Sequence, residues 1–215
     1  MRRILAVAAA AGMLFAAGPA AAALFTDDFE SGLGQWQAKT GSPFQGQIVA
    51  DPLGTPGNDV LNFTGLNQAG SIVSVPQFAG GGGPYVLTFD YLGYPAPSPV
   101  PPLGLGGFAG VGIAAGDPCD CWLAGTISNY VGAFGTVAFL VDDGQWHTYS
   151  ITFDPSTQPS LNPLFRLMLE DFSGSGGVAG DAYFDNITLS EVPEPSTLAL
   201  MALGLAGLLA FRRRA

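Results

Sequence analysis

Short runs of alternating or β-branched residues, separated by glycine and proline, constrain this fold more than any other feature of the sequence. The chain has 31 glycines and 17 prolines, and no stretch sustains the 3.6-residue period of an amphipathic helix. One run places four apolar side chains on a single face by alternation: Tyr85, Leu87, Phe89 and Tyr91. The pattern predicts an all-β domain, a β-sandwich made of many short strands.

The predicted strands fill the region between the two apolar ends of the chain. They are 24–29, 46–50, 59–63, 71–75, 85–92, 108–114, 121–128, 136–141, 146–153, 164–170 and 182–190. Four consecutive glycines (80–83) and the proline-rich segment 93–107 are typical of loops, and we interpret the second as a solvated surface loop rather than a binding loop. Without an internal repeat or a break in composition, residues 24–191 are predicted to form one domain.

The N-terminus has the features of a secretory signal peptide. Arg2 and Arg3 precede the apolar stretch 4–17, and an A-x-A cleavage pattern occurs twice, at Ala20 with Ala22 and at Ala21 with Ala23. We therefore expect residues 1–23 to be removed on export.

The C-terminal segment 192–215 has three parts in a fixed order. Pro193, Glu194 and Pro195 come first, an apolar run 198–211 follows, and three arginines end it. As a helix the apolar run spans about 21 Å, which is short against a hydrocarbon core of about 30 Å. We predict a single transmembrane helix over 197–211, with the arginines on the cytoplasmic side and the domain outside.

This order resembles the PEP-CTERM sorting signal. The resemblance implies that an exosortase cuts near Pro193-Glu194-Pro195, so that the membrane anchor is transient. It also implies delivery to the cell surface or the extracellular matrix of bacteria that make exopolysaccharide or biofilm. An ordinary tail anchor is the alternative.

The charge of the body excludes some partners. Between residues 24 and 193 there are 16 acidic residues but only Lys39 and Arg166 as basic ones, a formal balance of −14. Nucleic acid and anionic lipid are bound through cationic contacts, so neither is an expected partner of the body.

Asp185 stands out within the last predicted strand. By alternation it faces the same way as Tyr183, Ile187 and Leu189, which would put a carboxylate in an apolar row. Such a group must be protonated, paired, hydrogen-bonded to turn amides, or bound to a cation. Calcium suits carboxylates together with backbone carbonyls.

The opening DFESG with a following tryptophan and the closing YFDNITL together resemble calcium-stabilised carbohydrate-binding jelly rolls of the galactose-binding-like fold. The resemblance implies that the first and last strands are adjacent and that acidic residues near them hold a structural calcium. Glu30 and Asp185 would be the first ligand candidates, with Asp28 and Asp27 behind them. The alternative is that Asp27 and Asp28 are simply solvated.

Aromatic side chains are the natural platforms for sugar rings. The resemblance implies that Trp36 is buried in the core, and we expect Trp146 to cap the same core. We choose Trp122, Tyr130 and Tyr94, which lie nearest to predicted loops, as candidate ligand-binding residues. Packing remains the competing interpretation of each of these three.

Catalysis finds little support in the sequence. His147 is the only histidine, and no G-x-S-x-G motif supplies a nucleophile. A catalytic pair of carboxylates that are far apart in the sequence, as in glycosidases, remains an alternative. We expect Cys119 and Cys121 to form a local disulfide bond. The next alternative is that both are free thiols, and the third is that they form an intermolecular crosslink.

These observations predict an all-β jelly-roll β-sandwich, flanked by a signal peptide and a single transmembrane sorting helix. We expect a protein that is not an enzyme and that associates with glycan at the cell surface. A purely structural or adhesive matrix protein is the alternative, and a glycan-active hydrolase is the less favoured one.

Overall fold

The computed structural model describes residues 22–39, 46–63, 70–95, 106–113, 121–126, 134, 138–171 and 182–192. These belong to one compact unit that extends from Ala22 to Val192. The predicted signal peptide up to residue 21, the sorting segment from Pro193 onward, Tyr130 and Cys119 lie outside the described residues. Within the described ranges, no helix has the length and apolarity needed to cross a membrane.

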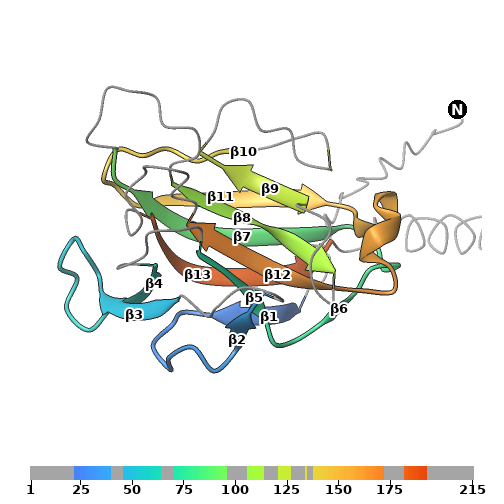
Figure 1. Cartoon of the computed structure of the whole chain (residues 1–215), viewed down its shortest axis with the longest axis horizontal. Helices are drawn as coiled ribbons and strands as arrows, with labels where there is room; N and C mark the ends of the chain where they lie inside the picture. Colours follow the sequence, from blue (N-terminus) through green and yellow to red (C-terminus); the bar gives the residue numbers. More distant parts are fainter. Residues whose placement is uncertain are drawn as a thin grey trace, which may run out of the picture. The chain divides into compact units, whose positions relative to one another are not determined.

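Two sheets of β-strands form the unit (Figure 1). Sheet A has the order β11 (His147–Phe153), β7 (Tyr85–Gly93), β13 (Ala182–Glu191), β4 (Asp59–Asn62) and β3 (Gln47–Ala50), and β1 (Ala23–Asp27) also pairs with β13. Sheet B has the order β10 (Ala138–Phe139), β9 (Cys121–Gly125), β8 (Gly107–Ile113), β12 (Leu164–Asp171), β5 (Gly70–Ser74) and β2 (Trp36–Ala38), and β6 (Phe78–Ala79) pairs with β12. Two short 3₁₀ turns, η1 (Pro155–Thr157) and η2 (Pro159–Leu161), join β11 to β12.

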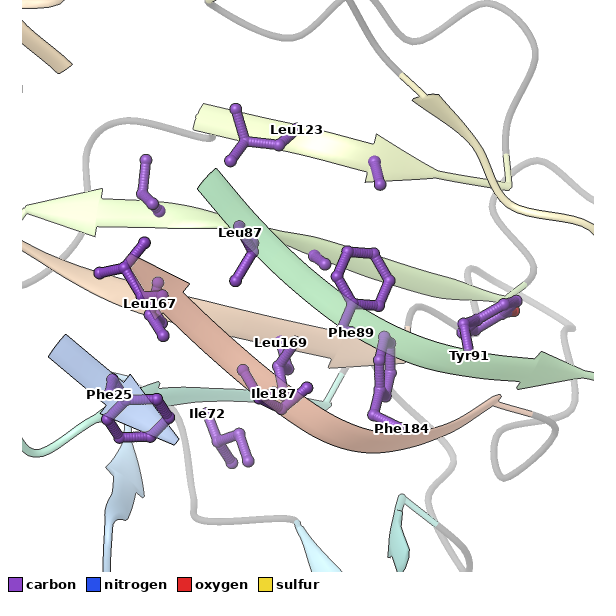
Figure 2. Packing of buried hydrophobic residues seen from close by; sticks show 14 of the residues in the cluster. Phe25, Ile72, Leu87, Phe89, Tyr91, Leu123, Leu167, Leu169, Phe184 and Ile187 are labelled. Atoms are coloured by element: carbon purple, nitrogen blue, oxygen red, sulfur yellow. The ribbon is translucent and has the colours of Figure 1, made fainter. Parts of the chain in front are cut away.

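The core lies between the sheets, and Figure 2 shows how it is filled. Inward-facing residues of β7 and β13 in sheet A and of β12 and β5 in sheet B supply its side chains: Leu87, Phe89, Tyr91, Phe184, Ile187, Leu167, Leu169 and Ile72. The predicted all-β sandwich is therefore confirmed. Trp36 is buried in the same core, as predicted.

The sequence pattern missed two short strands, β2 and β6, and overestimated another. Residues 136 and 137 of the predicted strand 136–141 lie outside the described ones, and of 138–141 only Ala138–Phe139 form a strand, β10, which pairs in parallel with β9. Such short edge strands carry too few residues for an alternating pattern to show.

The predicted alternation along β13 is wrong, and the cause is a β-bulge. The register with β7 shifts between Asp185 and Thr188, and Asn186 adopts a left-handed backbone with φ 52°. Because the bulge adds a residue, Ile187 belongs to the core together with Phe184, whereas Asp185 points to the outer side of sheet A. The expected row of Tyr183, Asp185, Ile187 and Leu189 on one face does not exist.

The glycine run 80–83 is a turn, as predicted, but it is tightly packed. Gly80 donates its N–H to the Pro163 carbonyl at 2.7 Å. A Cβ atom at Gly80 would overlap the carbonyl oxygen of Leu161 in η2. Glycine is thus required there for close backbone approach.

Candidate functional site: an aromatic and polar surface on sheet A, and an acidic junction beside it

A pair of tyrosine rings, one exposed and one half-buried, lies at one end of sheet A. Tyr94 directly follows β7 and is 36% exposed. Its ring meets the ring of Tyr183 edge to face, with centroids 5.9 Å apart. Tyr183 comes from β13, opposite Leu92 in register, so both strands contribute to the pair. Of the three predicted ligand-binding aromatics, Tyr94 is the one with an accessible ring in the described residues.

The turn 143–145 lies against this pair. A Cβ atom built on Gly144 would be 3.3 Å from a ring carbon of Tyr94, and the Gly144 N–H donates to the Gly93 carbonyl at 2.9 Å. Next to it, Asp143 accepts a hydrogen bond from His147 Nε2 at 3.0 Å, and this contact lowers the pKa of the Asp143 carboxyl. An aromatic face is therefore bordered by carboxylate and imidazole groups.

A row of polar side chains continues from there across the outer face of sheet A. Asp90 accepts hydrogen bonds from Thr148 Oγ1 at 2.5 Å and from Asn186 Nδ2 at 2.9 Å. One step further, Thr88 donates to Ser150 Oγ at 3.2 Å. These five residues, which we call the polar ladder, come from β7, β11 and β13 and face outward because their neighbours Leu87 and Phe89 face the core.

Trp122 lies elsewhere, on the outer face of sheet B. It is only 5% exposed and packs against Phe108 with ring centroids 5.3 Å apart. Val73 and Met168 complete this second cluster, which is separate from the main core. The structure does not bring Trp122 and Tyr94 together, since they belong to different sheets.

The four predicted metal ligands lie where β1 and β4 meet the bulge of β13. Glu30 accepts a hydrogen bond from the Asp59 N–H at 2.8 Å, and Asp185 accepts one from Asn58 Nδ2 at 3.3 Å. Two of the carboxylates thus contact consecutive residues at the start of β4. The first and last strands are paired, with Ala23 opposite Ser190, as the sequence resemblance implied.

Asp27 and Asp28 have different surroundings within this junction. Asp27 is buried, and its two oxygens accept hydrogen bonds from the Phe29 N–H at 2.9 Å and from Trp36 Nε1 at 2.8 Å. Burial raises the pKa of Asp27, although both hydrogen bonds oppose the rise. Asp28 accepts a bond from the Glu30 N–H at 3.2 Å and is exposed. Asp27 therefore holds the chain after β1 against Trp36.

Asp185 is the most perturbed carboxyl of the junction. Burial raises its pKa to about 6, bonds from the Asn186 N–H and Asn58 lower it, and the charges of Asp90 and Asp28 raise it further. No group of three or more histidine, cysteine, aspartate or glutamate side chains in the described ranges is arranged to hold a metal ion.

The sequence did not predict that Asp142 is a further carboxyl with a perturbed pKa. Asp142 accepts a hydrogen bond from the Tyr91 hydroxyl at 2.7 Å, and burial raises its pKa to about 6. The alternation of apolar and polar residues does not indicate the burial of Asp142, because this burial depends on Gly93 and Gly106. A Cβ atom at either glycine would lie against an oxygen of the Asp142 carboxyl. Cys121 is disulfide-bonded and buried.

The comparison with family models concerns the end of the chain. The PEP-CTERM protein-sorting motif matches residues 191–214. No curated protein matches the sequence.

Several solved structures have a similar arrangement of strands. The CBM22-1 xylan-binding domain of Xyn10C from Paenibacillus barcinonensis is 17% identical, with 82% of this chain and 98% of that chain covered at a TM-score of 0.45. CBM27-1 from Caldicellulosiruptor saccharolyticus, solved with mannohexaose, is 16% identical, with 78% and 96% covered at a TM-score of 0.41. The K1 cleaved adhesin domain of Lys-gingipain from Porphyromonas gingivalis W83 is 12% identical, with 78% and 98% covered at a TM-score of 0.45.

The chain thus carries a PEP-CTERM protein-sorting motif, which implies a secreted protein processed by an exosortase, and its neighbours of known structure include several carbohydrate-binding modules.

Proposed function

We propose that this protein is a non-catalytic glycan-binding module that the exosortase pathway places at the cell surface or in the exopolysaccharide matrix of a biofilm. The observation that carries the proposal is the exposed ring of Tyr94, packed against the half-buried Tyr183, with the polar ladder beside it. Sugar rings stack on aromatic faces, and their hydroxyls exchange hydrogen bonds with carboxylate, amide and hydroxyl groups. Sheet A offers both kinds of group on one outward surface.

The charge of the body favours a neutral or weakly charged glycan. The ladder contains Asp90, and Asp185 lies opposite it in register. The only basic residues of the body are Lys39 and Arg166, and Arg166 is buried against carbonyls of β5 and the residue after it. A polyanionic chain would meet uncompensated carboxylates here, so neutral hexose or pentose polymers fit better.

Glycan-array binding of the sandwich, residues 22–192, tests the proposal. Tyr94→Ala should reduce binding at least tenfold, because it removes the exposed ring while leaving the core intact. Phe139→Ala is the matched control, since Phe139 is an exposed aromatic, 57% accessible, on the edge of sheet B. Trp122→Phe should leave binding unchanged, because the indole is already buried.

The outcome separates the alternatives. Absence of binding to every glycan would reject the module and favour a structural or adhesive matrix protein. Turnover of a released polysaccharide, lost when a single carboxylate is changed, would instead indicate a hydrolase.

We further propose that the acidic junction binds a structural calcium ion. Glu30, Asp185 and the Asn58 side chain would hold it, with Asp28 close by and Asp27 positioning the chain through Trp36. Support comes from the contacts of Glu30 and Asp185 with consecutive residues and from the raised pKa of Asp185, which a cation would reverse. When bound, the ion would tie β1, β4 and β13 together and stabilise the fold by linkage.

Calorimetric melting with calcium and with EGTA tests this second proposal. Calcium should raise the midpoint in the wild type, and Asp185→Asn should abolish most of that rise. An unchanged midpoint in the wild type at millimolar calcium would reject the site.

A further inference from the structure

The sandwich holds the chain in place up to the residue before the sorting motif's first proline. Glu191 is the last residue of β13 and lies opposite Tyr85 in register. The next residue, Val192, donates its N–H to the Pro84 carbonyl at 2.8 Å. The PEP-CTERM match starts at residue 191, so the motif begins within the folded domain and no spacer separates the two.

One end of the sandwich contains both of its chain termini. Ala23, at the start of β1, lies opposite Ser190 of β13. Tyr85 links the two sheets there, because it pairs with Glu191 and its hydroxyl donates to the Ala79 carbonyl at 2.9 Å. In Figure 1 β6 and the orange turns η1 and η2 lie at this same end. We call it the Val192 end.

The length of chain between this end and the apolar segment is small. Residues 193–197 separate Val192 from Leu198, where the apolar run begins. Five residues reach at most about 18 Å when fully extended. The polar layer of a bilayer takes up about 5–8 Å of that distance on each side.

The surface at this end suits contact with a lipid headgroup layer. It consists of the glycine turn 80–83, the turns η1 and η2 and the end of β13, and its charged residues among the described ones are Asp154 and the exposed Glu191. Leu24 and Leu164 are exposed beside these turns, at 46% and 39%. A surface of short turns, isolated leucines and two separate carboxylates can approach zwitterionic headgroups while both carboxylates stay in contact with water.

We propose that the Val192 end is the face of the sandwich that rests on the membrane while the sorting segment is uncut. The sandwich then stands upright, and Tyr94, at the opposite end of β7, is held away from the lipid. The nine residues of β7 put about 30 Å between the two ends. The inference rests on the sorting part of the proposed function and does not depend on glycan binding.

Quenching of a fluorophore by nitroxide-headgroup lipids tests this orientation. The full chain is reconstituted in phosphatidylcholine vesicles with a label on Gly81→Cys, in the turn of the Val192 end, or on Gln145→Cys, near Tyr94. Gly81 tolerates the change because no atom lies within 4 Å of a Cβ built there. Cys121 is disulfide-bonded and does not compete for the label.

We expect quenching at Gly81→Cys to exceed that at Gln145→Cys by at least threefold. Equal quenching at both sites, or stronger quenching at Gln145→Cys, would overturn the proposal. A chain that ends at Val192 should show no quenching at either site. The experiment includes no sugar, so failure of glycan binding leaves its outcome unaffected.

A spacer variant tests whether the short connection causes the orientation. Twenty Gly and Ser residues inserted between Val192 and Pro193 should remove the difference between the two labels, because such a flexible linker spans more than the height of the headgroup layer. A difference that survives the spacer would show that the connection does not set the orientation and would overturn this explanation.

Discussion

The outer faces of the two sheets differ in what they offer to a partner. On sheet A the polar ladder and Tyr94 lie at the surface, and the ladder consists of three hydroxyls, one carboxylate and one amide. On sheet B the outward residues Val73, Phe108, Trp122 and Met168 are between 1% and 7% exposed and form a small core of their own. Burial, rather than residue type, therefore decides which aromatic can meet a ligand.

Glycines explain how the sheet B cluster becomes so compact. Gly110 lies opposite Trp122 in register, and a Cβ atom there would be 2.8 Å from the Trp122 Cα. Gly125 leaves room for the ring of Phe108 in the same way. On sheet A, by contrast, the ladder residues all carry side chains that bond to one another across strands. One face is built to pack and the other to present polar groups.

The largest effect should come from truncating an aromatic on each face. Trp122→Ala should destabilise the sandwich by about 3–5 kcal/mol, because it removes a buried ring and leaves a cavity. Tyr94→Ala should cost less than about 1 kcal/mol, since its ring is partly solvated. Urea unfolding of both variants measures the contrast. Equal losses of stability would show that the two faces do not differ in burial.

Two neighbouring glycines of β8 give the next contrast. Gly110→Ala should cost about 2 kcal/mol, because the new Cβ would lie 2.6 Å from the Cys121 carbonyl oxygen and backbone must shift. Gly112→Ala is the matched control, with its nearest neighbour, Met168 Sδ, at an ordinary 3.6 Å. It should be neutral or slightly stabilising. Thermal melting of the pair measures the contrast, and a larger loss at Gly112 would contradict this description of the Trp122 cluster.

The sequence predicted the sandwich well because its core strands are long and alternate regularly. β7 and β12 show the pattern over seven or more residues, and their inward residues are those that alternation selects. Trp36 was assigned to the core correctly from the resemblance, because the resembled modules bury an aromatic residue after the opening strand. The pairing of the first and last strands came from the resemblance of the two end motifs.

The candidate site was harder to predict because it depends on departures from alternation. The bulge at Asn186 moves Asp185 to the outer face, and no local rule signals an extra residue in YFDNITL. Trp122 and Tyr94 are both aromatic residues near predicted loops, so the sequence could not rank their exposure. The contacts of Glu30 with Asp59 and of Asp185 with Asn58 join segments far apart in the chain.

A third prediction concerns the charge carried by the outer face of sheet A. Burial raises the pKa of Asp185 from 3.8 to about 6, so the folded state binds this proton more tightly than the unfolded state does. The resulting stabilisation is fully present below about pH 4 and is lost as the pH rises through about 6. In EGTA at pH 7, Asp185→Asn should therefore stabilise the sandwich by about 1 kcal/mol after allowance for solvent screening.

Urea unfolding at pH 5 and pH 7 measures this effect. The wild type should lose stability between the two values, and Asp185→Asn should lose less. Part of the pH dependence of stability should remain in both proteins, because burial also raises the pKa of Asp142 to about 6. A variant that is less stable than the wild type at pH 7 without calcium would mean that the Asp185 charge is compensated within the fold.

The smallest change in stability is expected in the polar ladder itself, where Thr148→Val removes the hydrogen bond to Asp90 but keeps a β-branched side chain on an exposed strand. Stability should change by no more than about 0.5 kcal/mol. Glycan affinity should nevertheless fall several-fold, because the ladder would lose a hydroxyl that orders Asp90 for a sugar. Thr152→Val is the matched control, since Thr152 is also exposed on β11 but lies opposite Val86. Isothermal titration with a glycan selected on the array compares the two, and equal affinities would restrict the binding surface to the Tyr94–Tyr183 pair.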